Sequence, residues 1–403
     1  MSTTTTTARR GGLTAGNPPD AGRAGIGTPR IAVIRQAYRV DGGAERFVAG
    51  LASTLGGQNV QVTVITRRWD GAGQQDVITC DPPKPTRVIR DWGFARGVRR
   101  ILRSHRFDLV QSNERIPGCH LYRAGDGVHR EWLRQRARTQ SLPARLATAL
   151  SPYHAWVRYA ERAMFESPEM RAVICNGQMV RDEILEWFDI EPEKLHIIHT
   201  GVDTDYFHPR CRETGEDTRR GLGVSNDTPL FAFIGSGFAR KGLDAAIRAI
   251  AAVPEAHLIV VGQNNHTARF RRLSRSLGAA ERLHFTGILS DVLPVYGAAD
   301  ALLLPTLYDP FPNVTLEAMA CGLPVVTSTK CGAAEIIRNG ENGWVSDALD
   351  VHEFTRALRT LCDSDRCRSI GDEARRTAEC FTLDVMRERL LDLYNRLLTD
   401  HGH

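Results

Sequence analysis

The chain has 403 residues, of which 42% are apolar and 25% charged, and its formal net charge is +5. This length exceeds what one hydrophobic core usually organises, so two domains are expected in a globular protein of ordinary composition. No run approaches the ~18 apolar residues that a membrane-spanning helix needs. The nine cysteines lack any C-x-x-C pair, which excludes the usual disulfide frameworks and zinc sites and favours reduced, partly buried thiols.

Residues 1–29 are rich in Thr, Gly, Pro and Arg, and they lack the apolar segment of a secretory signal, so we expect a disordered tail. A strand is expected at Arg30–Arg35. Gly42 and Gly43 follow it and open a helix predicted over Ala44–Leu55. Two glycines at such a turn let the backbone approach a ligand closely, although many turns of this kind bind nothing.

Further strands are predicted at Val60–Thr66 and Asp108–Ser112, with a basic helix at Phe94–His105 between them. Thirteen arginines and five acidic residues lie between Arg87 and Arg138. This cluster is typical of a surface that meets a polyanion, such as nucleic acid, an anionic lipid or a phosphorylated glycolipid. An arginine-rich composition on every solvated face explains the cluster equally well.

The segment Val128–Arg138 combines arginines with Trp132. It suits a helix on an anionic membrane surface, or a solvated basic helix with Trp132 in the core. One long helix is expected over Leu146–Phe165. The remaining elements predicted for the first half are Ala172–Asn176 (strand), Gln178–Trp187 (helix) and Leu195–His199 (strand).

The second half is expected to open with the polar linker Cys211–Asp227, which contains a short helix. A strand at Leu230–Ile234 is then followed by the turn Gly235–Gly242 and a helix at Leu243–Val253. The turn lacks the third glycine of a dinucleotide fingerprint and carries Arg240 and Lys241 instead. Two cations held at a strand end can neutralise a diphosphate. A basic helix start is the alternative, but it opposes the helix dipole.

A strand at Ala301–Pro305, a polar loop, a helix at Val314–Ala320 and a strand at Val325–Ser328 follow one another closely. Ligands of open α/β sheets bind beyond the carboxyl ends of such strands. The backbone amides of residues 313–315 (Asn313, Val314 and Thr315) would be free at the helix N-terminus and could bind an anion.

Asp309 in this loop and Glu317 in this helix are eight residues apart. A nucleoside diphosphate sugar would use both features, because the amides take the diphosphate while the carboxylates accept hydrogen bonds from sugar hydroxyls. The alternative is a solvated loop acid and a helix acid that the dipole favours.

Alternating strands and helices in both halves predict two parallel, doubly wound α/β domains. Closing helices are expected at Val351–Cys362, Asp365–Cys380 and Leu383–Leu398. Asp203-Thr204-Asp205 matches a metal-binding D-x-D pattern, but Asp363-Ser364-Asp365 matches it equally well. We therefore predict neither a metal site nor a cofactor.

The stretch from Asp309 to Pro324 resembles the acid-x7-acid signature of retaining GT-B glycosyltransferases of family 4, with Asp309 where Glu is commoner. The resemblance spans about residues 30 to 395. It includes matches at Gly42–Glu45, Thr200–Pro209 and Gly235–Gly242. The last of these, with the stretch 117–166, is most similar to lipopolysaccharide core α-1,3-glucosyltransferases.

This resemblance implies a GT-B fold, in which two Rossmann-like domains face an interdomain cleft. The expected limits are 30–205 for an N-terminal, acceptor-side domain and 206–380 for a C-terminal, nucleotide-sugar domain. Residues 381–403 would form a helix that crosses back to the first domain.

The implied reaction is transfer of a hexose, in the first place glucose, from a UDP-sugar to a lipopolysaccharide-core or related lipid-linked acceptor. The reaction would proceed with retention and without a metal.

The implied catalytic residues are Arg240 and Lys241 on the leaving diphosphate, Asp309 on the donor sugar, Glu317 on the ribose and Asp126 on the acceptor or reacting sugar. Asp126 lies between two glycines and could instead satisfy its own backbone. The implied substrate-binding residues are Gly42, Gly43, Asn113 (where many members carry His), Gly235, Asn313, Val314, Thr315 and Glu317.

The basic face of the first domain would then dock an anionic glycolipid at the inner membrane surface, and the protein would be cytoplasmic and peripherally attached. Nucleic acid is not an expected partner. Two alternatives stay open: a family 4 transferase for another polysaccharide or lipid carrier, and a non-catalytic module that binds anions or membranes.

Overall fold

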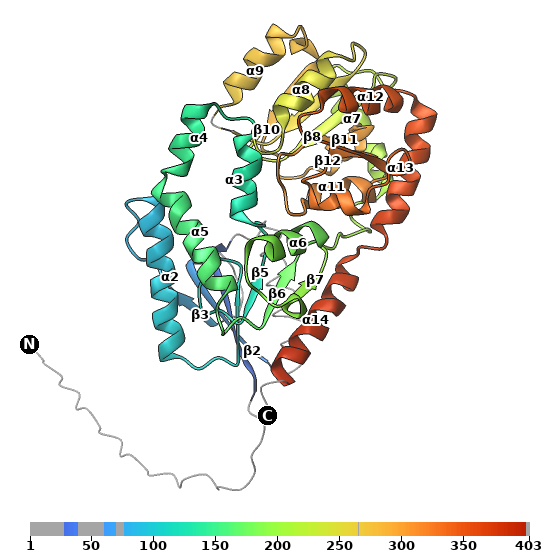
Figure 1. The fold of residues 1–403 in the computed structure, drawn as a ribbon. Helices are drawn as coiled ribbons and strands as arrows, with labels where there is room; N and C mark the ends of the chain where they lie inside the picture. Colours follow the sequence, from blue (N-terminus) through green and yellow to red (C-terminus); the bar gives the residue numbers. More distant parts are fainter. Residues whose placement is uncertain (1–27, 39–59, 70–75, 265, 400–403) are drawn as a thin grey trace, which may run out of the picture.

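The computed structural model describes residues 28–38, 60–69, 76–264 and 266–399. The described chain forms two lobes, each built on a parallel sheet with helices around it (Figure 1). The prediction of two doubly wound α/β domains is therefore confirmed. The helix predicted over 44–55 lies outside the described residues.

Within the described residues, the first sheet has the strand order β3-β2-β1-β4-β5-β6-β7, and all its neighbours are parallel. The direction of strand order reverses between β1 and β4, which is where such sheets bind ligands. Its strands are β1 Arg30–Tyr38, β2 Gln61–Trp69, β3 Asp76–Thr79, β4 Leu109–Ser112, β5 Leu121–Arg123, β6 Ala172–Cys175 and β7 Leu195–Ile197.

Strand β1 shows how this sheet is covered on both faces. Ile31 and Val33 belong to a buried cluster with the last helix of the chain, whereas Ala32 and Ile34 belong to a cluster with helices α2, α5 and α6. Successive side chains of a strand point to opposite faces, so an unbroken apolar run is what a doubly covered strand requires. In the part of the chain that the structure describes, the helices that precede β8 are α2 Arg87–Ser104, α3 His129–Ala137, α4 Leu142–Ala149, α5 Pro152–Phe165, α6 Gln178–Trp187 and α7 Arg212–Leu222.

The prediction of one helix over Leu146–Phe165 is wrong, because the structure has two helices, α4 and α5, that are separated at Ser151. Pro152 occupies the first turn of α5. A proline there lacks the N–H that would continue the preceding helix, and it pushes the residue before it into an extended conformation. The short helix predicted within the linker at 211–227 is confirmed as α7.

The second sheet, within the described residues, has the order β10-β9-β8-β11-β12-β13 and is likewise parallel. Its strands are β8 Leu230–Ile234, β9 His257–Val261, β10 Leu283–Gly287, β11 Ala301–Leu304, β12 Val325–Ser328 and β13 Gly343–Ser346. Its helices are α8 Leu243–Ala251, α9 Thr267–Ser276, α10 Leu293–Ala298, α11 Asn313–Ala320, α12 Val351–Leu361 and α13 Ser364–Ala378. Short 3-10 helices lie at Pro192–Lys194, Pro209–Cys211, Ala280–Arg282 and Gly332–Ile336.

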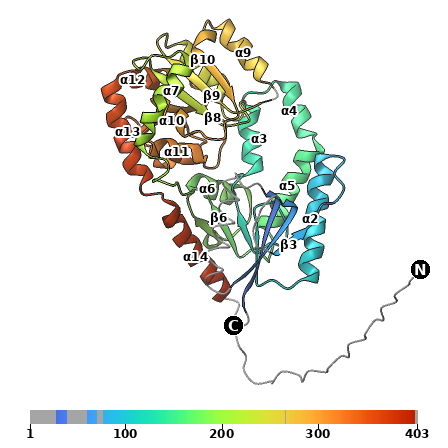
Figure 2. The ribbon, with the colours of Figure 1, turned by 180° about the vertical axis from the view of Figure 1, so that it is seen from behind.

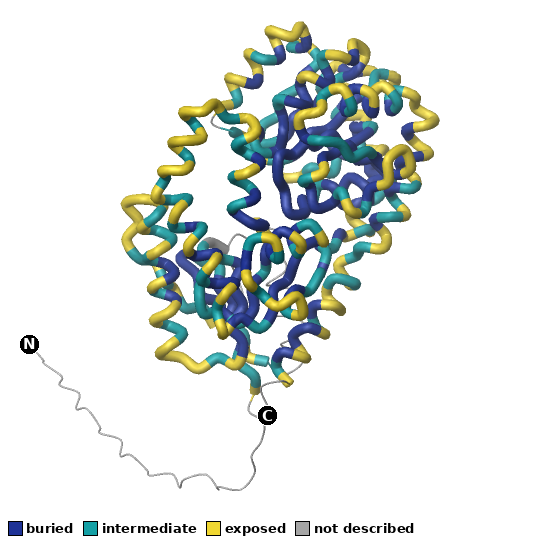
Figure 3. The backbone as a smooth tube through the Cα atoms, viewed as in Figure 1, coloured by how far each residue is buried: buried dark blue, intermediate teal, exposed yellow. Residues whose placement is uncertain are grey.

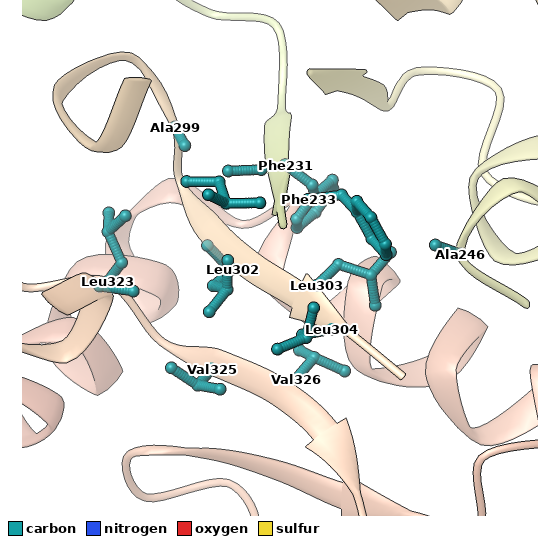
Figure 4. Close-up of a cluster of buried hydrophobic side chains, with 14 of the residues drawn as sticks. Phe231, Phe233, Ala246, Ala299, Leu302, Leu303, Leu304, Leu323, Val325 and Val326 are labelled. Carbon is teal, nitrogen blue, oxygen red and sulfur yellow. The ribbon is translucent and has the colours of Figure 1, made fainter. Parts of the chain in front are cut away.

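The core of the second lobe is formed by the central strands β8, β11 and β12. Figure 4 shows buried side chains of this core, among them Phe231 and Phe233 of β8, Leu302 of β11 and Val326 of β12. Every residue of these three strands is buried, as Figure 3 also shows for the centre of each lobe. Because these strands are rigidly packed, the loops that leave their carboxyl ends are held in defined positions.

The last helix, α14 Leu383–Thr399, leaves the second lobe and runs along the first (Figures 1 and 2). Two backbone hydrogen bonds to Val202 hold the start of α14. Val202 N donates to Phe381 O at 2.9 Å, and Leu383 N donates to Val202 O at 3.2 Å. Leu390, Leu393 and Tyr394 of α14 are buried against the first sheet. Among the helices that the structure describes, none is both long and apolar enough to cross a membrane.

Candidate functional site

The predicted cations and the first predicted acid meet at the point where the strand order of the second sheet reverses. Arg240 and Lys241 follow β8, Asp309 follows β11, and these two strands are neighbours. Lys241 Nζ lies 2.7 Å from Asp309 Oδ2, and Arg240 Nη1 lies 3.0 Å from the same oxygen. Lys241 and Asp309 are buried, while the Arg240 side chain is 38% exposed. Two cations and one carboxylate therefore share this site, which leaves a net positive charge.

The glycines of the turn at residues 235–242 are required by its geometry. Gly235 has a φ of +137°, and a Cβ built there would lie 3.1 Å from Cε of Lys241. Gly242 has a φ of +81°, and its Cβ would lie 1.8 Å from the carbonyl oxygen of Pro305. A side chain at either position would push Lys241 away or separate α8 from β11. The glycine spacing thus serves to bring two cations against a strand end.

Backbone contacts fix the loop that carries Asp309. Asp309 N donates to Lys330 O at 2.9 Å, and Gly332 N donates to Asp309 O at 2.8 Å. Leu307 N donates to the carbonyl of Arg240 at 2.8 Å. The loop is therefore tied both to the turn after β8 and to the segment after β12.

Helix α11 carries the second predicted acid. Glu317 Oε2 accepts a hydrogen bond from the hydroxyl of Tyr296 at 2.8 Å, and Tyr296 is fully buried. Burial raises the pKa of Tyr296 well above its ordinary value, and the charge of Glu317 raises it further, so the hydroxyl stays a donor. This contact holds one oxygen of Glu317 in a defined direction.

The prediction of three free amides at the start of α11 is wrong for Thr315. Its N–H donates to Pro312 O at 3.1 Å, its hydroxyl donates to the same oxygen at 2.6 Å, and the residue is fully buried. Asn313 and Val314 are partly exposed in the first turn, and Pro312, which precedes them, makes no side-chain cap. Thr315 therefore stabilises the start of α11 through its own hydrogen bonds and has no free amide to offer a ligand.

In the first lobe, Asn113 lies directly after β4, next to the reversal of strand order. It is buried, and its Oδ1 accepts from Gln111 Nε2 at 3.3 Å. Its Nδ2 has no hydrogen-bond partner among the residues that the structure describes. Gly42 and Gly43, predicted to bind substrate, lie outside the described residues.

Asp126 lies in the turn between β5 and α3, and its side chain is 69% exposed. Its Oδ2 is 3.5 Å from Nη1 of Arg115, and Arg115 also bonds Glu161 Oε1 at 2.9 Å. Within the described part of the chain, the carboxylate of Asp126 makes no hydrogen bond to its own backbone. The turn itself is closed by Gly127 N, which donates to Ala124 O at 3.1 Å.

Both Asp-x-Asp sequences act as local caps. Asp203 Oδ1 accepts from the backbone N–H groups of Asp205 and Tyr206 at 3.1 and 2.9 Å. Asp363 Oδ1 accepts from Asp365 N and Arg366 N at 3.1 and 3.0 Å, at the start of α13. Their first aspartates are thus explained by the turns that they stabilise.

Sequence reasoning missed the residues that join the lobes. Tyr308 and Lys330 of the second lobe contact Glu183 in α6, and Lys330 also contacts Glu131 in α3. Glu335 accepts hydrogen bonds from Gln178 N at 2.7 Å and from His199 Nε2 at 2.5 Å. No spacing rule links residues that are 125 or more positions apart, so only the folded chain reveals these pairs.

Two family descriptions match the two lobes. Residues 41–206 match "Glycosyltransferase Family 4", and residues 215–377 match "Glycosyl transferases group 1". Together with the two Rossmann-like lobes and the charged site between β8 and β11, these matches define the class. The chain belongs to the GT-B glycosyltransferases, with a family 4 N-terminal half and a group 1 C-terminal half.

Among named proteins, the chain is similar to the lipopolysaccharide glucosyltransferase WaaG of Escherichia coli (strain K12). The two are 28% identical over 373 residues, which are 90% of this chain and 98% of WaaG. A crystal structure of WaaG superposes with a TM-score of 0.77 at 26% identity, over 90% of this chain and 99% of that one. A D-inositol 3-phosphate glycosyltransferase of Corynebacterium glutamicum (strain R) is 29% identical over 61% of this chain and 61% of its own length.

Proposed function

We propose that the protein is a retaining glycosyltransferase that moves glucose from UDP-glucose to a lipopolysaccharide-core or related lipid-linked acceptor. The observation that carries the proposal is the pair of cations, Arg240 and Lys241, held against Asp309 at the reversal point of the second sheet. Similarity to a lipopolysaccharide glucosyltransferase over 98% of its length supports the choice of donor and acceptor.

On the donor side, Arg240 and Lys241 would stabilise the charge that develops on the leaving diphosphate. Preorganised charges of this kind usually supply the largest part of catalysis. The amides of Asn313 and Val314 would add donors, Glu317 would accept from the ribose, and Gly235 would allow close approach to the phosphates. The bound diphosphate then competes with Asp309 for the two cations, which frees the Asp309 carboxylate for a donor sugar hydroxyl.

On the acceptor side, the proposed residues are Asp126 and Asn113, with Gly42 and Gly43 beyond the described part of the chain. The acceptor oxygen would attack C1 of the sugar on the face from which the diphosphate leaves. The leaving phosphate would take the acceptor proton, so the bond that forms and the bond that breaks share one face and no covalent enzyme intermediate is needed. No metal enters this scheme, and we propose that the enzyme is metal-independent.

We further propose that the protein docks peripherally on the cytoplasmic face of the inner membrane and does not bind nucleic acid. Helix α3 is not suited to lie on the membrane, because Glu131 and Gln135 are buried and Glu131 pairs with the second lobe. Helix α4 suits this role better. Leu142, Leu146 and Leu150, which we call the leucine stripe, are 78%, 62% and 73% exposed.

The surroundings of the leucine stripe favour an anionic membrane over a protein partner. Arg145 is exposed within α4, between Leu142 and Leu146. The next helix along the chain, α5, carries the exposed Arg162, which pairs with Glu166 at 2.9 Å. Helix α2, which packs on α5, presents Trp92 at 46% exposure. Apolar side chains flanked by arginines and an aromatic residue are what an interfacial helix uses on anionic lipid.

The test is a transfer assay with UDP-, ADP- and GDP-hexoses, lipopolysaccharide-core acceptors and EDTA throughout. Turnover of UDP-glucose with retention at C1, despite chelation, is the expected result. Activity that returns only with added metal would contradict the metal-independent scheme, and turnover of a different donor alone would contradict the assignment of glucose.

A second acceptor class belongs in the same assay, because several D-inositol 3-phosphate glycosyltransferases match this chain at 28–31% identity. They match over only 55–64% of this chain and 50–63% of their own length. Transfer to inositol phosphate with none to the lipopolysaccharide core would select this alternative.

A further inference from the structure

Tyr308 joins the two lobes through a buried hydroxyl. It lies in the loop after β11 and is 2% exposed. The hydroxyl accepts a hydrogen bond from the backbone N–H of Val128 at 2.8 Å and donates one to Glu183 Oε2 at 2.7 Å. Burial raises the pKa of Tyr308 well above its ordinary value, and the charge of Glu183 raises it further, so this hydroxyl keeps its proton and remains a donor.

Both ends of this bridge lie next to proposed site residues. Val128 follows the turn at residues 125–127, which carries Asp126, and Asp309 is the next residue after Tyr308. The fit is close, because a Cβ on Gly127 would lie 2.1 Å from the Tyr308 hydroxyl, and Gly127 has a φ of +64°. A glycine at this position lets the acceptor-side turn rest directly on the donor-side loop.

An ion-pair cluster of two buried glutamates and the partly exposed Lys330 supports the bridge from the other side. Lys330 Nζ lies 2.8 Å from Glu183 Oε1 and 3.1 Å from Glu131 Oε1, and the two glutamates come from α6 and α3. The carbonyl of Lys330 accepts from Asp309 N, as described above. The loop with Asp309 is therefore held by the first lobe through the side chain of Tyr308 and through the side chain and backbone of Lys330.

We propose that Tyr308 is a positioning residue for sugar transfer: its hydroxyl bridges Val128 and Glu183 and thereby sets the Asp126 turn against the Asp309 loop. The inference rests on the proposed function for the roles of Asp126 and Asp309. Tyr308 needs no contact with substrate for this role. It determines how the Asp126 turn and the Asp309 loop are positioned relative to each other when both ligands are bound.

Tyr308→Phe is the sharp test, because it removes the hydroxyl and keeps the ring. Misplacement of reacting groups by about 1 Å can cost about 100-fold, so kcat should fall by about 10- to 100-fold. Donor binding should hardly change, since the residues proposed to bind the nucleotide all lie in the second lobe. The dissociation constant for UDP, measured by calorimetry, should therefore stay within about twofold of wild type.

Tyr394→Phe is the matched control. Tyr394 is a fully buried tyrosine of α14 whose hydroxyl has no hydrogen-bond partner among the residues that the structure describes. It should leave kcat and the UDP dissociation constant unchanged. Deuterium uptake by the segment 124–131, which contains the Val128 amide, should rise in Tyr308→Phe and not in Tyr394→Phe.

If Tyr308→Phe does not fold, Glu183→Ala tests the same bridge. It removes the acceptor of the hydroxyl, so kcat should fall and uptake at 124–131 should rise. Glu183→Gln retains an oxygen for Tyr308 and should recover part of the loss. An unchanged kcat in Tyr308→Phe or Glu183→Ala, or an equal loss in Tyr394→Phe, would overturn the inference.

Failure of the proposed function would appear differently. It would show as absence of transfer by the wild-type protein with every donor and acceptor. Deuterium uptake needs no activity, so it would still report on the bridge. Uptake that is the same in wild type and Tyr308→Phe would overturn the positioning role independently of any sugar.

Discussion

Asp309 contacts both cations of the site, so its carboxylate determines how much positive charge meets an incoming anion. In the absence of ligand, one negative and two positive charges are enclosed together, and the Lys241 and Asp309 side chains are only 10% and 9% exposed. Removing one member of a buried pair leaves the other poorly compensated, whereas removing both costs less. This asymmetry gives a test that separates stability from catalysis.

Lys241→Met should destabilise the fold by about 1–3 kcal/mol, because Asp309 keeps only Arg240 as an ionic partner among the described residues. It should also lower the transfer rate by about 100- to 1,000-fold. The double variant Lys241→Met/Asp309→Asn should regain much of the stability and none of the rate. Urea unfolding and initial rates measure the two effects. Stability losses that simply add would show that the two side chains are not coupled.

His129 gives a prediction about pH. Burial first of all, and then the nearby charges of Arg115 and His154, together lower its pKa from 6.5 to about 3. The folded protein therefore keeps His129 neutral, whereas the unfolded chain binds a proton near pH 6.5. Its contribution to stability is present above pH 6.5 and is lost as the pH falls toward 3, at up to about 1.4 kcal/mol per pH unit.

His129→Gln should flatten that dependence. Urea unfolding at pH 7, 6 and 5 should show a smaller loss of stability on acidification in the variant than in the wild type. Equal slopes for the two proteins would contradict the assignment to His129. Comparison with wild type removes the contribution of the carboxylates that also titrate in this range.

At the scale of single elements, α4 is unusual because none of its residues is buried. The leucine stripe recurs every four residues, so it occupies one side of the helix. Replacing the three leucines with serine should abolish binding to vesicles that contain phosphatidylglycerol and leave unfolding unchanged, as judged by co-sedimentation and thermal melting. Serine at Leu349 and Leu383, exposed leucines on other elements, is the control. Retained binding by the triple variant would exclude α4 as the docking helix.

An element could be predicted well when its own residues mark it, and poorly when it forms only through pairing or packing with other segments. Helix α6 and strands β8 and β12 have the predicted bounds, because apolar residues and neighbouring glycines mark them in the sequence. Strand β5 has three residues and exists through its pairing with β4 and β6. Helix α9 buries only Phe270 and Ser274, so its basic sequence carries almost no apolar period. Strand β13, at the edge of the second sheet, was not predicted either, because only one of its four residues is buried.

Part of the site could be predicted, because some of its residues follow strands that their own sequence marks. Arg240, Lys241 and Asp309 each follow a strand that the sequence marks, and adjacent strands bring them together. The engagement of the Thr315 amide was not predicted, since it depends on the extended backbone of Pro312, whose carbonyl accepts from that amide. The bridge from Tyr308 to Glu183 links two lobes, and nothing in either local segment signals it. The domain limits at residues 205/206 and 380/381 stay a prediction.

At the scale of the whole molecule, α14 makes the first lobe depend on residues that follow the second. Leu393 is 1% exposed in the cluster beneath the first sheet. Leu393→Ala should destabilise the protein by about 2–5 kcal/mol, the cost of a cavity in a packed core. The loss should fall on the first lobe, where deuterium uptake in β1 and β4 should rise while β8 and β11 stay protected. Equal loosening of both sheets would show that the lobes unfold as one unit.

The path of α14 also bears on how the protein is made. A ribosome delivers β1 and β4 long before α14, and the whole of β8 to β13 emerges between them. The second lobe can close around its own residues as they appear, whereas the first must keep one face of its sheet uncovered until α14 arrives. Unfinished sheets with exposed apolar faces are prone to aggregate. The lobe whose synthesis starts first is therefore the last to be completed, and it is the one that would need protection in the cell.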